Sequence, residues 1–312
     1  MLANLTTMGA DFAAIGAALE MLLPQINILF LLPLVSLFIW YIVVFKSYKT
    51  IGRFLLVLSL IFVSYVISGF MAKPNWSLIL KDTFLPQLSF QPTYWLAVVA
   101  FLGTTITPYL FFWQTSEEVE DSPSVKDVKS EVKENAPGFI FSNFITYFII
   151  ICTATVLFKN GISINSAEQA ALALRPFLGQ YAFFLFALGI IGAGLLALPV
   201  LACSTAYTVA ETFNWKEGLS QKPSRALGFY TVLSATFLIS LAIALLKINP
   251  IKILFYSQVL NGLLAPFLLV LIMIIARSRQ ILGEYILSRG LTFWGWLTVL
   301  VMFGAGLAIF LT

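Results

Sequence analysis

The sequence predicts an all-α membrane protein, a polytopic bundle of about nine transmembrane helices. Of its 312 residues, 60% are hydrophobic and only 10% are charged, whereas about a quarter of the residues in soluble domains are charged. The charges are also unevenly spread, since ten of them fall between Glu117 and Glu134. Eight uncharged stretches of 19 or more residues remain. Each is about long enough to cross a bilayer as a helix.

The apolar runs and the breaks between them define the expected spans in order. They are residues 1–23, 25–45, 53–72, 94–120, 138–158, 180–211, 226–246, 250–277 and 290–311. The first span is atypical because Asp11 lies within its apolar core. Small residues at Gly9, Ala13 and Ala17 form a ladder along it that suits close helix packing, so we expect this span to be buried among others.

The basic residues of the loops predict an orientation. Alternate loops at 46–53, 121–137, 214–225 and 277–289 hold twelve Lys and Arg residues, and the remaining loops hold six. The positive-inside rule then places the N-terminus in the cytoplasm and the C-terminus outside, in a multi-pass protein of the plasma membrane. Residues 116–137 carry seven acids and three lysines and predict a charged, solvated cytoplasmic linker.

One further polar segment, residues 166–175, predicts a short surface helix capped by Ser166.

Composition also excludes several functions. The chain has no histidine, and its two cysteines, Cys152 and Cys203, lie inside apolar runs. Zinc sites built on histidine and Ser-His or Cys-His catalysis are therefore excluded. We therefore expect that the protein is not an enzyme, holds no resident cofactor and does not bind nucleic acid.

The strongest polar feature within a span is the Gly-Thr-Thr-Ile-Thr-Pro segment at 103–108. Pro108 has no amide hydrogen, so the carbonyl of Thr104 loses its helical partner. Thr107 precedes the proline and is disfavoured in helical geometry. We expect a helix break between Gly103 and Pro108, as in inverted-repeat transporters whose freed carbonyls coordinate cations. A simple proline kink, with threonines bonded to their own helix, is the alternative.

Two other features have both a functional and a structural interpretation. In the eighth span we expect a second break at Gly262 and Pro266. Gln258 and Asn261 lie three positions apart and therefore on one face of that helix, where they serve either as ligands or as contacts between helices. In the first span, Asn4, Thr7 and Asp11 form a polar stripe. An intramembrane carboxylate there either lines a proton pathway or bonds to a neighbouring group.

Four segments together resemble the Nramp family of proton-coupled divalent-metal transporters. Residues 103–120, 188–215, 257–267 and 3–22 are similar, in order and spacing, to that family's sixth, eighth, tenth and third spans. The resemblance implies a LeuT-like inverted repeat of five plus five helices, with metal held between the broken first and sixth helices.

On this basis the chain is a single transmembrane domain, 1–312, with an incomplete first repeat. Residues 1–72 are the remainder of the first repeat, 94–277 form the second, and 290–311 are an extra helix. Only three spans precede the second repeat, so two helices are lacking. The family's Asp-Pro-Gly-Asn motif, which supplies its principal carboxylate ligand, occurs nowhere in the sequence. We therefore expect half a metal site, which a separate chain could complete.

The resemblance also implies site residues. Thr104, Ile106 and Thr107 are the implied backbone or hydroxyl ligands, Gln258 is a further ligand, and Asp11 takes part in proton handling.

The sequence departs from the family at three positions, two of them next to Pro108 and one near Asp11. Thr107, Pro108 and Tyr109 replace a Met-Pro-His triplet, and Ala14 stands where the family usually has a second acid. Loss of the sulfur ligand favours harder ions such as Mn²⁺ or Mg²⁺.

The leading interpretation is a secondary transporter that moves a divalent cation, Mn²⁺-like or Fe²⁺-like or Mg²⁺, inward with protons by alternating access. One alternative is a permease of the same fold for an amino acid or another organic solute. The other is a non-transporting membrane protein that needs a partner chain. The lipid bilayer, the cation and the proton are the expected partners.

Overall fold

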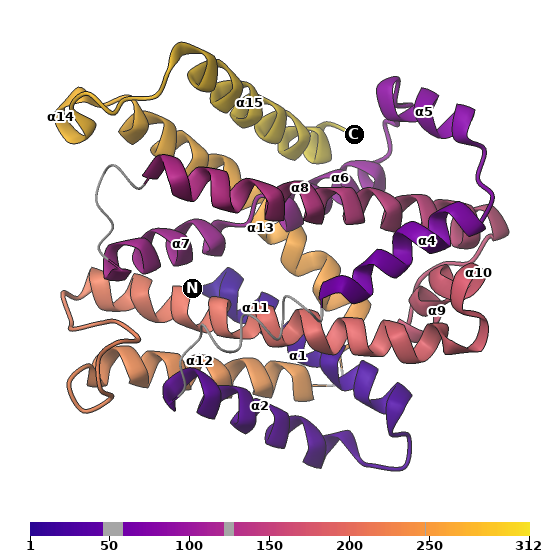
Figure 1. Ribbon diagram of the computed structural model, residues 1–312, viewed down its shortest axis with the longest axis horizontal. Helices are drawn as coiled ribbons and strands as arrows, with labels where there is room; N and C mark the ends of the chain where they lie inside the picture. Colours follow the sequence, from indigo (N-terminus) through magenta and orange to yellow (C-terminus); the bar gives the residue numbers. More distant parts are fainter. Residues whose placement is uncertain (46–58, 122–127, 247) are drawn as a thin grey trace. The chain divides into compact units, whose positions relative to one another are not determined.

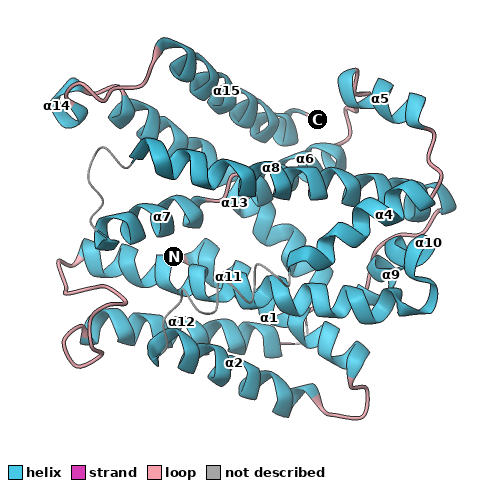
Figure 2. Ribbon diagram, in the orientation of Figure 1, coloured by secondary structure: helices cyan, strands magenta, loops and turns pink. Residues whose placement is uncertain are grey.

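The computed structural model describes residues 1–45, 59–121, 128–246 and 248–312, which form helices and loops with no strand among them (Figure 2). The all-α fold class is confirmed for these residues. The α-helices are α1 Leu2–Leu22, α2 Ile28–Phe45, α4 Val63–Met71, α5 Trp76–Phe84, α6 Pro92–Thr105, α7 Pro108–Asp121, α8 Val128–Cys152, α9 Ala167–Ala171, α10 Arg175–Leu178, α11 Ala182–Thr212, α12 Leu227–Leu245, α13 Pro250–Ala276, α14 Arg279–Leu282 and α15 Arg289–Leu311.

Eight helical stretches in the described residues are long and apolar enough to cross a membrane, and they correspond to eight of the nine expected spans. The remaining span was expected at 53–72. Its residues 53–58 lie outside the described part, and the rest forms a short apolar helix at Leu60–Met71. The protein is therefore a multi-pass helical membrane protein, as its composition predicts.

The described helices group into two compact units. Unit 1 comprises Met1–Pro86 and Phe112–Ile253, and unit 2 comprises Gln87–Phe111 and Leu254–Thr312. The second repeat expected at 94–277 is thus divided between the units, with α6 and most of α13 in unit 2.

In unit 1, α1 is the central helix and packs on α11 and α12, while α2 lies beside α12 (Figure 1). Gly9 permits the α1–α12 contact, because a Cβ there would lie 2.7 Å from the Ile243 Cγ2 atom. Asn4 Nδ2 donates a hydrogen bond to Thr205 Oγ1 of α11 over 3.0 Å. In an 18-residue window of α1, 61% of the residues are buried, against 17% for α2. The expected burial of the first span is confirmed.

A second cluster within unit 1 joins α4 to α8. Gly69 of α4 lies against Phe148, where a Cβ would come within 2.7 Å of the ring, and Cys152 Sγ donates to the Tyr65 carbonyl over 3.2 Å. Farther along the chain, Ser166 caps α9 by accepting a bond from the Gln169 amide over 3.3 Å, as expected.

The charged segment 116–137 is helical wherever it is described. Helix α7 runs on to Asp121, and α8 begins at Val128 and continues through Pro137. Residues 122–127 lie outside the described part. Glu and Lys favour helix as strongly as most apolar residues do, so a charged segment can be helical.

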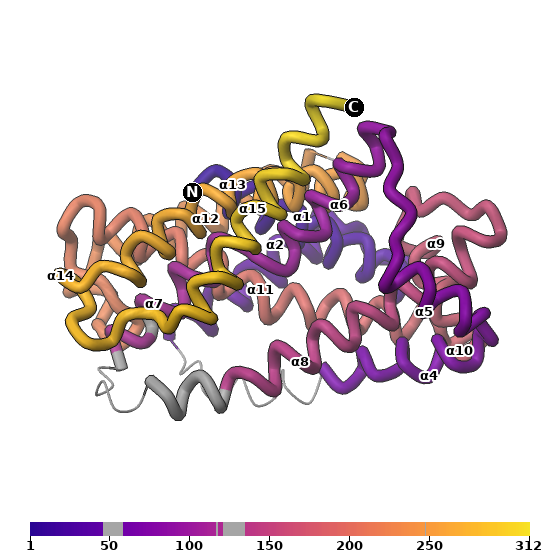
Figure 3. The backbone as a smooth tube through the Cα atoms, turned by 90° about the horizontal axis from the view of Figure 1, so that it is seen from above, coloured from indigo at the N-terminus to yellow at the C-terminus, as the bar shows by residue number. Residues whose placement is uncertain are grey.

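Unit 2 is built from α6, α13, α14 and α15. Its core consists of Val99 and Ala100 from α6, Val259 from α13 and Ala305 from α15. The chain leaves α13, turns at α14 and returns as α15 (Figure 3).

Candidate functional site

The expected helix break lies between α6 and α7. Helix α6 ends at Thr105 and α7 begins at Pro108, which leaves Ile106 and Thr107 outside both helices. The Ile106 amide donates to the Leu102 carbonyl over 2.8 Å and closes the last turn of α6. The carbonyl of Thr104 has no helical partner, because Pro108 has no N–H group. The interruption predicted from Gly103 and Pro108 is therefore present.

The threonine hydroxyls at the break differ in their bonding. The hydroxyls of Thr104 and Thr105 donate to the Phe101 carbonyl of their own helix, over 2.7 and 3.2 Å. The helix is therefore interrupted even though two of its threonines bond back to it. Thr107 is only 2% exposed, and its hydroxyl has no hydrogen-bond partner in the described part of the chain. A buried hydroxyl left without a partner costs about 1–3 kcal/mol. This atom is the most distinctive polar group at the break.

Two glycines bring α6 and α13 into backbone contact next to the break. A Cβ at Gly103 would overlap the Gln258 carbonyl oxygen and lie 2.5 Å from the Gly262 nitrogen. A Cβ at Gly262 would overlap the Val99 carbonyl oxygen and lie 2.8 Å from Val99 Cγ1. The structure thus places the backbone of Gln258 on α13 directly against Gly103, the residue that precedes Thr104.

The second expected break, at Gly262 and Pro266, is wrong. Helix α13 continues from Pro250 to Ala276 with Pro266 inside it. Proline removes only one backbone bond, to the Gly262 carbonyl, and neighbouring groups in a helix bundle can tolerate that loss. Gly262 is needed for the close approach to α6 and not for an interruption.

The polar side chains of α13 bond to each other. Asn261 is fully buried, and its Nδ2 atom donates to Gln258 Oε1 over 3.2 Å. Gln258 is half-buried, and its Nε2 atom lies 3.5 Å from Ser257 Oγ. The bond from Asn261 orients the Gln258 amide and still leaves acceptor capacity on its oxygen.

Asp11 lies on α1 in unit 1, whereas the four predicted ligands are in unit 2. It is half-buried, and no hydrogen bond or ion pair to its carboxylate is found among the described residues. Asn4 on the same stripe bonds to Thr205, so this member of the stripe joins two helices.

A carboxylate site at the far end of α7 was missed by the sequence analysis. Glu120 accepts a short hydrogen bond from the Tyr207 hydroxyl, and further bonds from the backbone amides of Leu219 and Ser220 over 3.1 and 2.6 Å. Gly218 makes this turn possible, because its φ of 117° is a conformation that other residues rarely adopt. A Cβ there would also lie in tight contact with the carboxylate, at 3.1 Å. Successive amides of such a turn form an anion-binding concavity.

Other acids surround this site. Burial raises the pKa of Glu217 above its ordinary value, and repulsion from Glu211 and Glu120 raises it further. The Glu211 carboxylate accepts a bond from Ser116 Oγ over 3.2 Å. The sequence showed these acids only as scattered charges, because the contacts join segments about 90–100 residues apart.

Replacing Glu120 with alanine is expected to lower the free energy of unfolding by about 1–3 kcal/mol, because three donors lose their acceptor. Thermal unfolding in detergent would measure this change. Glu118→Ala is the matched control, since that carboxylate accepts a bond from Gln114 at an exposed position, and we expect a change within about 0.5 kcal/mol. Equal destabilisation by both variants would contradict the assignment.

The donor chemistry at the break is limited to oxygen. The described residues contain no group of three or more His, Cys, Asp or Glu side chains that could hold a metal ion. The predicted ligands offer carbonyl, hydroxyl and amide oxygens only, all of them neutral.

Comparison with known proteins decides the family. A family model described as natural resistance-associated macrophage protein-like, or Nramp, matches residues 1–312. The chain belongs to the Nramp family. Among curated Nramp relatives, the divalent metal cation transporter MntH of Caldanaerobacter subterraneus subsp. tengcongensis is 25% identical over 294 residues, which cover 91% of this chain and 67% of the relative.

Two other Nramp relatives carry the same name. The divalent metal cation transporter MntH of Clostridium acetobutylicum is 26% identical, with 71% of this chain and 50% of the relative covered. The one from Bacillus subtilis is 22% identical, with 78% and 56% covered. The chain thus spans between half and two thirds of the length of these Nramp relatives.

Proposed function

We propose that the chain acts in a secondary transporter for a divalent metal cation in the plasma membrane. The observation that carries this proposal is the break between α6 and α7. It presents the freed Thr104 carbonyl and the Thr107 hydroxyl, which has no hydrogen-bond partner among the described residues. Broken membrane helices serve as cation sites in transporters because their free oxygens replace the hydration shell. The Nramp match and the names of the MntH relatives support the same activity.

In this proposal Thr104, Ile106, Thr107 and Gln258 are the cation ligands, and the cation is a transported substrate and not a resident cofactor. Their oxygens favour Mn²⁺, Fe²⁺ or Mg²⁺ over softer ions. A carboxylate is still needed to compensate the charge of the ion. We propose that residues outside these 312 supply it, either in the same polypeptide or in a separate chain.

Proton coupling belongs to the same proposal, with Asp11 as the proton-handling group. Its carboxylate lies within a candidate span, where an uncompensated charge is costly and protonation relieves that cost. The distribution of basic loops supports a cytoplasmic N-terminus and an external C-terminus.

The test is uptake by proteoliposomes that contain the protein as isolated from its native host, with any chain that copurifies. We expect Mn²⁺ uptake that other divalent cations inhibit and amino acids do not. Inhibition by an amino acid would favour an organic-solute permease. Absence of any cation uptake would favour the non-transporting alternative, and robust uptake by residues 1–312 alone would contradict the incomplete site.

Proton coupling is tested in the same vesicles. The variant Asp11→Asn is expected to lose the acceleration of Mn²⁺ uptake by an inward proton gradient, because the amide cannot accept the proton. Glu20→Gln is the matched control, since Glu20 is an exposed acid near the end of the same helix. An unchanged gradient dependence in Asp11→Asn would exclude this role.

A further inference from the structure

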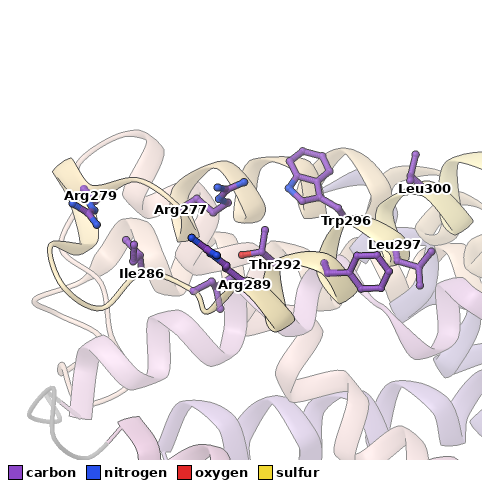
Figure 4. Close-up of a pocket in the computed structure, with 10 residues that line it drawn as sticks. Arg277, Arg279, Ile286, Arg289, Thr292, Trp296, Leu297 and Leu300 are labelled. Atoms are coloured by element: carbon purple, nitrogen blue, oxygen red, sulfur yellow. The ribbon is translucent and has the colours of Figure 1, made fainter.

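We propose that a pocket at the ends of α13, α14 and α15 binds an anionic phospholipid. The pocket has a volume of about 790 Å³ and is lined by three arginines and by an apolar stretch of α15. Figure 4 shows the arginines toward one end of the pocket, and Trp296, Leu297 and Leu300 toward the other. The arrangement matches a lipid, because the arginines can face a charged head group and the apolar residues can face an acyl chain.

The charged end consists of Arg277, Arg279 and Arg289, all of them exposed. Within the described residues, none of the three guanidinium groups has an ion pair or a side-chain hydrogen bond. The only acid in the connecting segment is Glu284. Three free guanidinium groups around one pocket match a phosphodiester, because each offers donors in a planar fork that fits phosphate oxygens.

The pocket is held in shape by the backbone of the connection. The Leu287 amide donates to the Ala276 carbonyl over 3.0 Å, which fastens the loop before α15 to the end of α13. Arg277 directly follows the end of α13, and Arg289 is the first residue of α15, so the two arginines stand at the two ends of this connection. Thr292, one turn into α15, adds a hydroxyl at the charged end.

The apolar end distinguishes a lipid from a free phosphate. Trp296, Leu297 and Leu300 lie three, four and seven positions after Phe293, so all four side chains lie on one face of α15. Phe293 and Leu300 are 64% and 67% exposed. A free phosphate ion would make no favourable contact with this apolar face, whereas an acyl chain would pack against it.

The position of the pocket agrees with this ligand. It lies where two candidate spans, α13 and α15, end, and hence at the boundary between membrane and water. Tryptophan is enriched at that boundary. Basic pockets between transmembrane helices on the cytoplasmic side are typical binding sites for anionic head groups, and the loop 277–289 is one of the basic loops that we expect there.

Native mass spectrometry of the detergent-purified full chain tests the proposal, with phosphatidylglycerol or phosphatidylcholine as the added probe. We expect phosphatidylglycerol to remain bound at concentrations where phosphatidylcholine does not. The triple variant Arg277→Gln, Arg279→Gln, Arg289→Gln is expected to weaken phosphatidylglycerol binding by about tenfold or more. Phe293→Asn is expected to weaken it without changing the charge.

The matched control is Lys216→Gln, Lys222→Gln, Arg225→Gln, which removes the same charge from another basic loop. Both triple variants are first compared by thermal unfolding, so that a loss of fold is recognised. Equal loss of binding in both would show a nonspecific charge effect and overturn the proposal. Competition by inorganic phosphate as strong as that by the lipid, or unchanged binding in the arginine variant, would overturn it as well. The outcome does not depend on whether the chain transports a cation.

Discussion

Replacing Gly103 with alanine is expected to lower the free energy of unfolding by about 1–3 kcal/mol, the range for inserting a methyl group into a packed core. The added Cβ would overlap the carbonyl oxygen of Gln258 and approach the nitrogen of Gly262. Both atoms belong to the backbone of α13, so no side chain can rotate away. The two helices would have to separate, and the break at Thr107 would shift relative to Gln258. Thermal unfolding in detergent would measure the change.

Gly304→Ala is the matched control, because a Cβ at Gly304 in α15 meets nothing within 4 Å. That variant should be neutral or slightly stabilising, since alanine favours helix over glycine by about 1 kcal/mol. Gly262→Ala should resemble Gly103→Ala, and the double variant should be less destabilised than the sum, because the helices separate only once. Equal stability of Gly103→Ala and Gly304→Ala would show that the helices do not touch there.

The second large effect is expected at Thr107, where a substitution should lower transport without lowering stability. Thr107→Val keeps the shape of the side chain and removes a buried hydroxyl that has no partner in the described residues. The free energy of unfolding should stay the same or rise, because an unsatisfied polar group is removed. Cation uptake should fall by about tenfold, the effect of losing roughly 1.4 kcal/mol of ligand binding.

A purely structural threonine would behave differently. If the hydroxyl stabilised the break through a hydrogen bond, Thr107→Val would lower stability and uptake together. Thr107→Ser retains the hydroxyl and should keep cation uptake near that of the unsubstituted protein. Unfolding and uptake measured on the same preparations would separate the two roles.

The sequence predicted the fold class because the number of charged residues limits how much surface can face water, whatever the packing. It also predicted the break at Gly103 and Pro108, since a missing N–H and a restricted Thr107 act locally. The same reasoning failed at Pro266, where the surrounding helices decide whether one lost hydrogen bond ends a helix. Local chemistry alone could not separate these two prolines.

The remaining features depend on contacts between distant segments. The Gly103–Gly262 crossing and the Glu120 site each join residues far apart in sequence, and no spacing rule connects them. The sequence places the arginines at 277, 279 and 289 in one basic loop. It does not show the pocket that they line, because that pocket forms only when the chain turns at α14 and continues as α15. Nothing in the sequence predicted which hydroxyl at the break would lack a partner.

The central claim, that the oxygens freed at the α6–α7 break bind the cation, is tested most directly by Mn²⁺ affinity. Isothermal titration calorimetry should be carried out on the natively isolated protein, on Thr107→Val and on Thr107→Ser. We predict a dissociation constant about tenfold higher for Thr107→Val, the equivalent of 1.4 kcal/mol, and close to the unsubstituted value for Thr107→Ser. An unchanged dissociation constant in Thr107→Val, with its stability intact, would contradict the account.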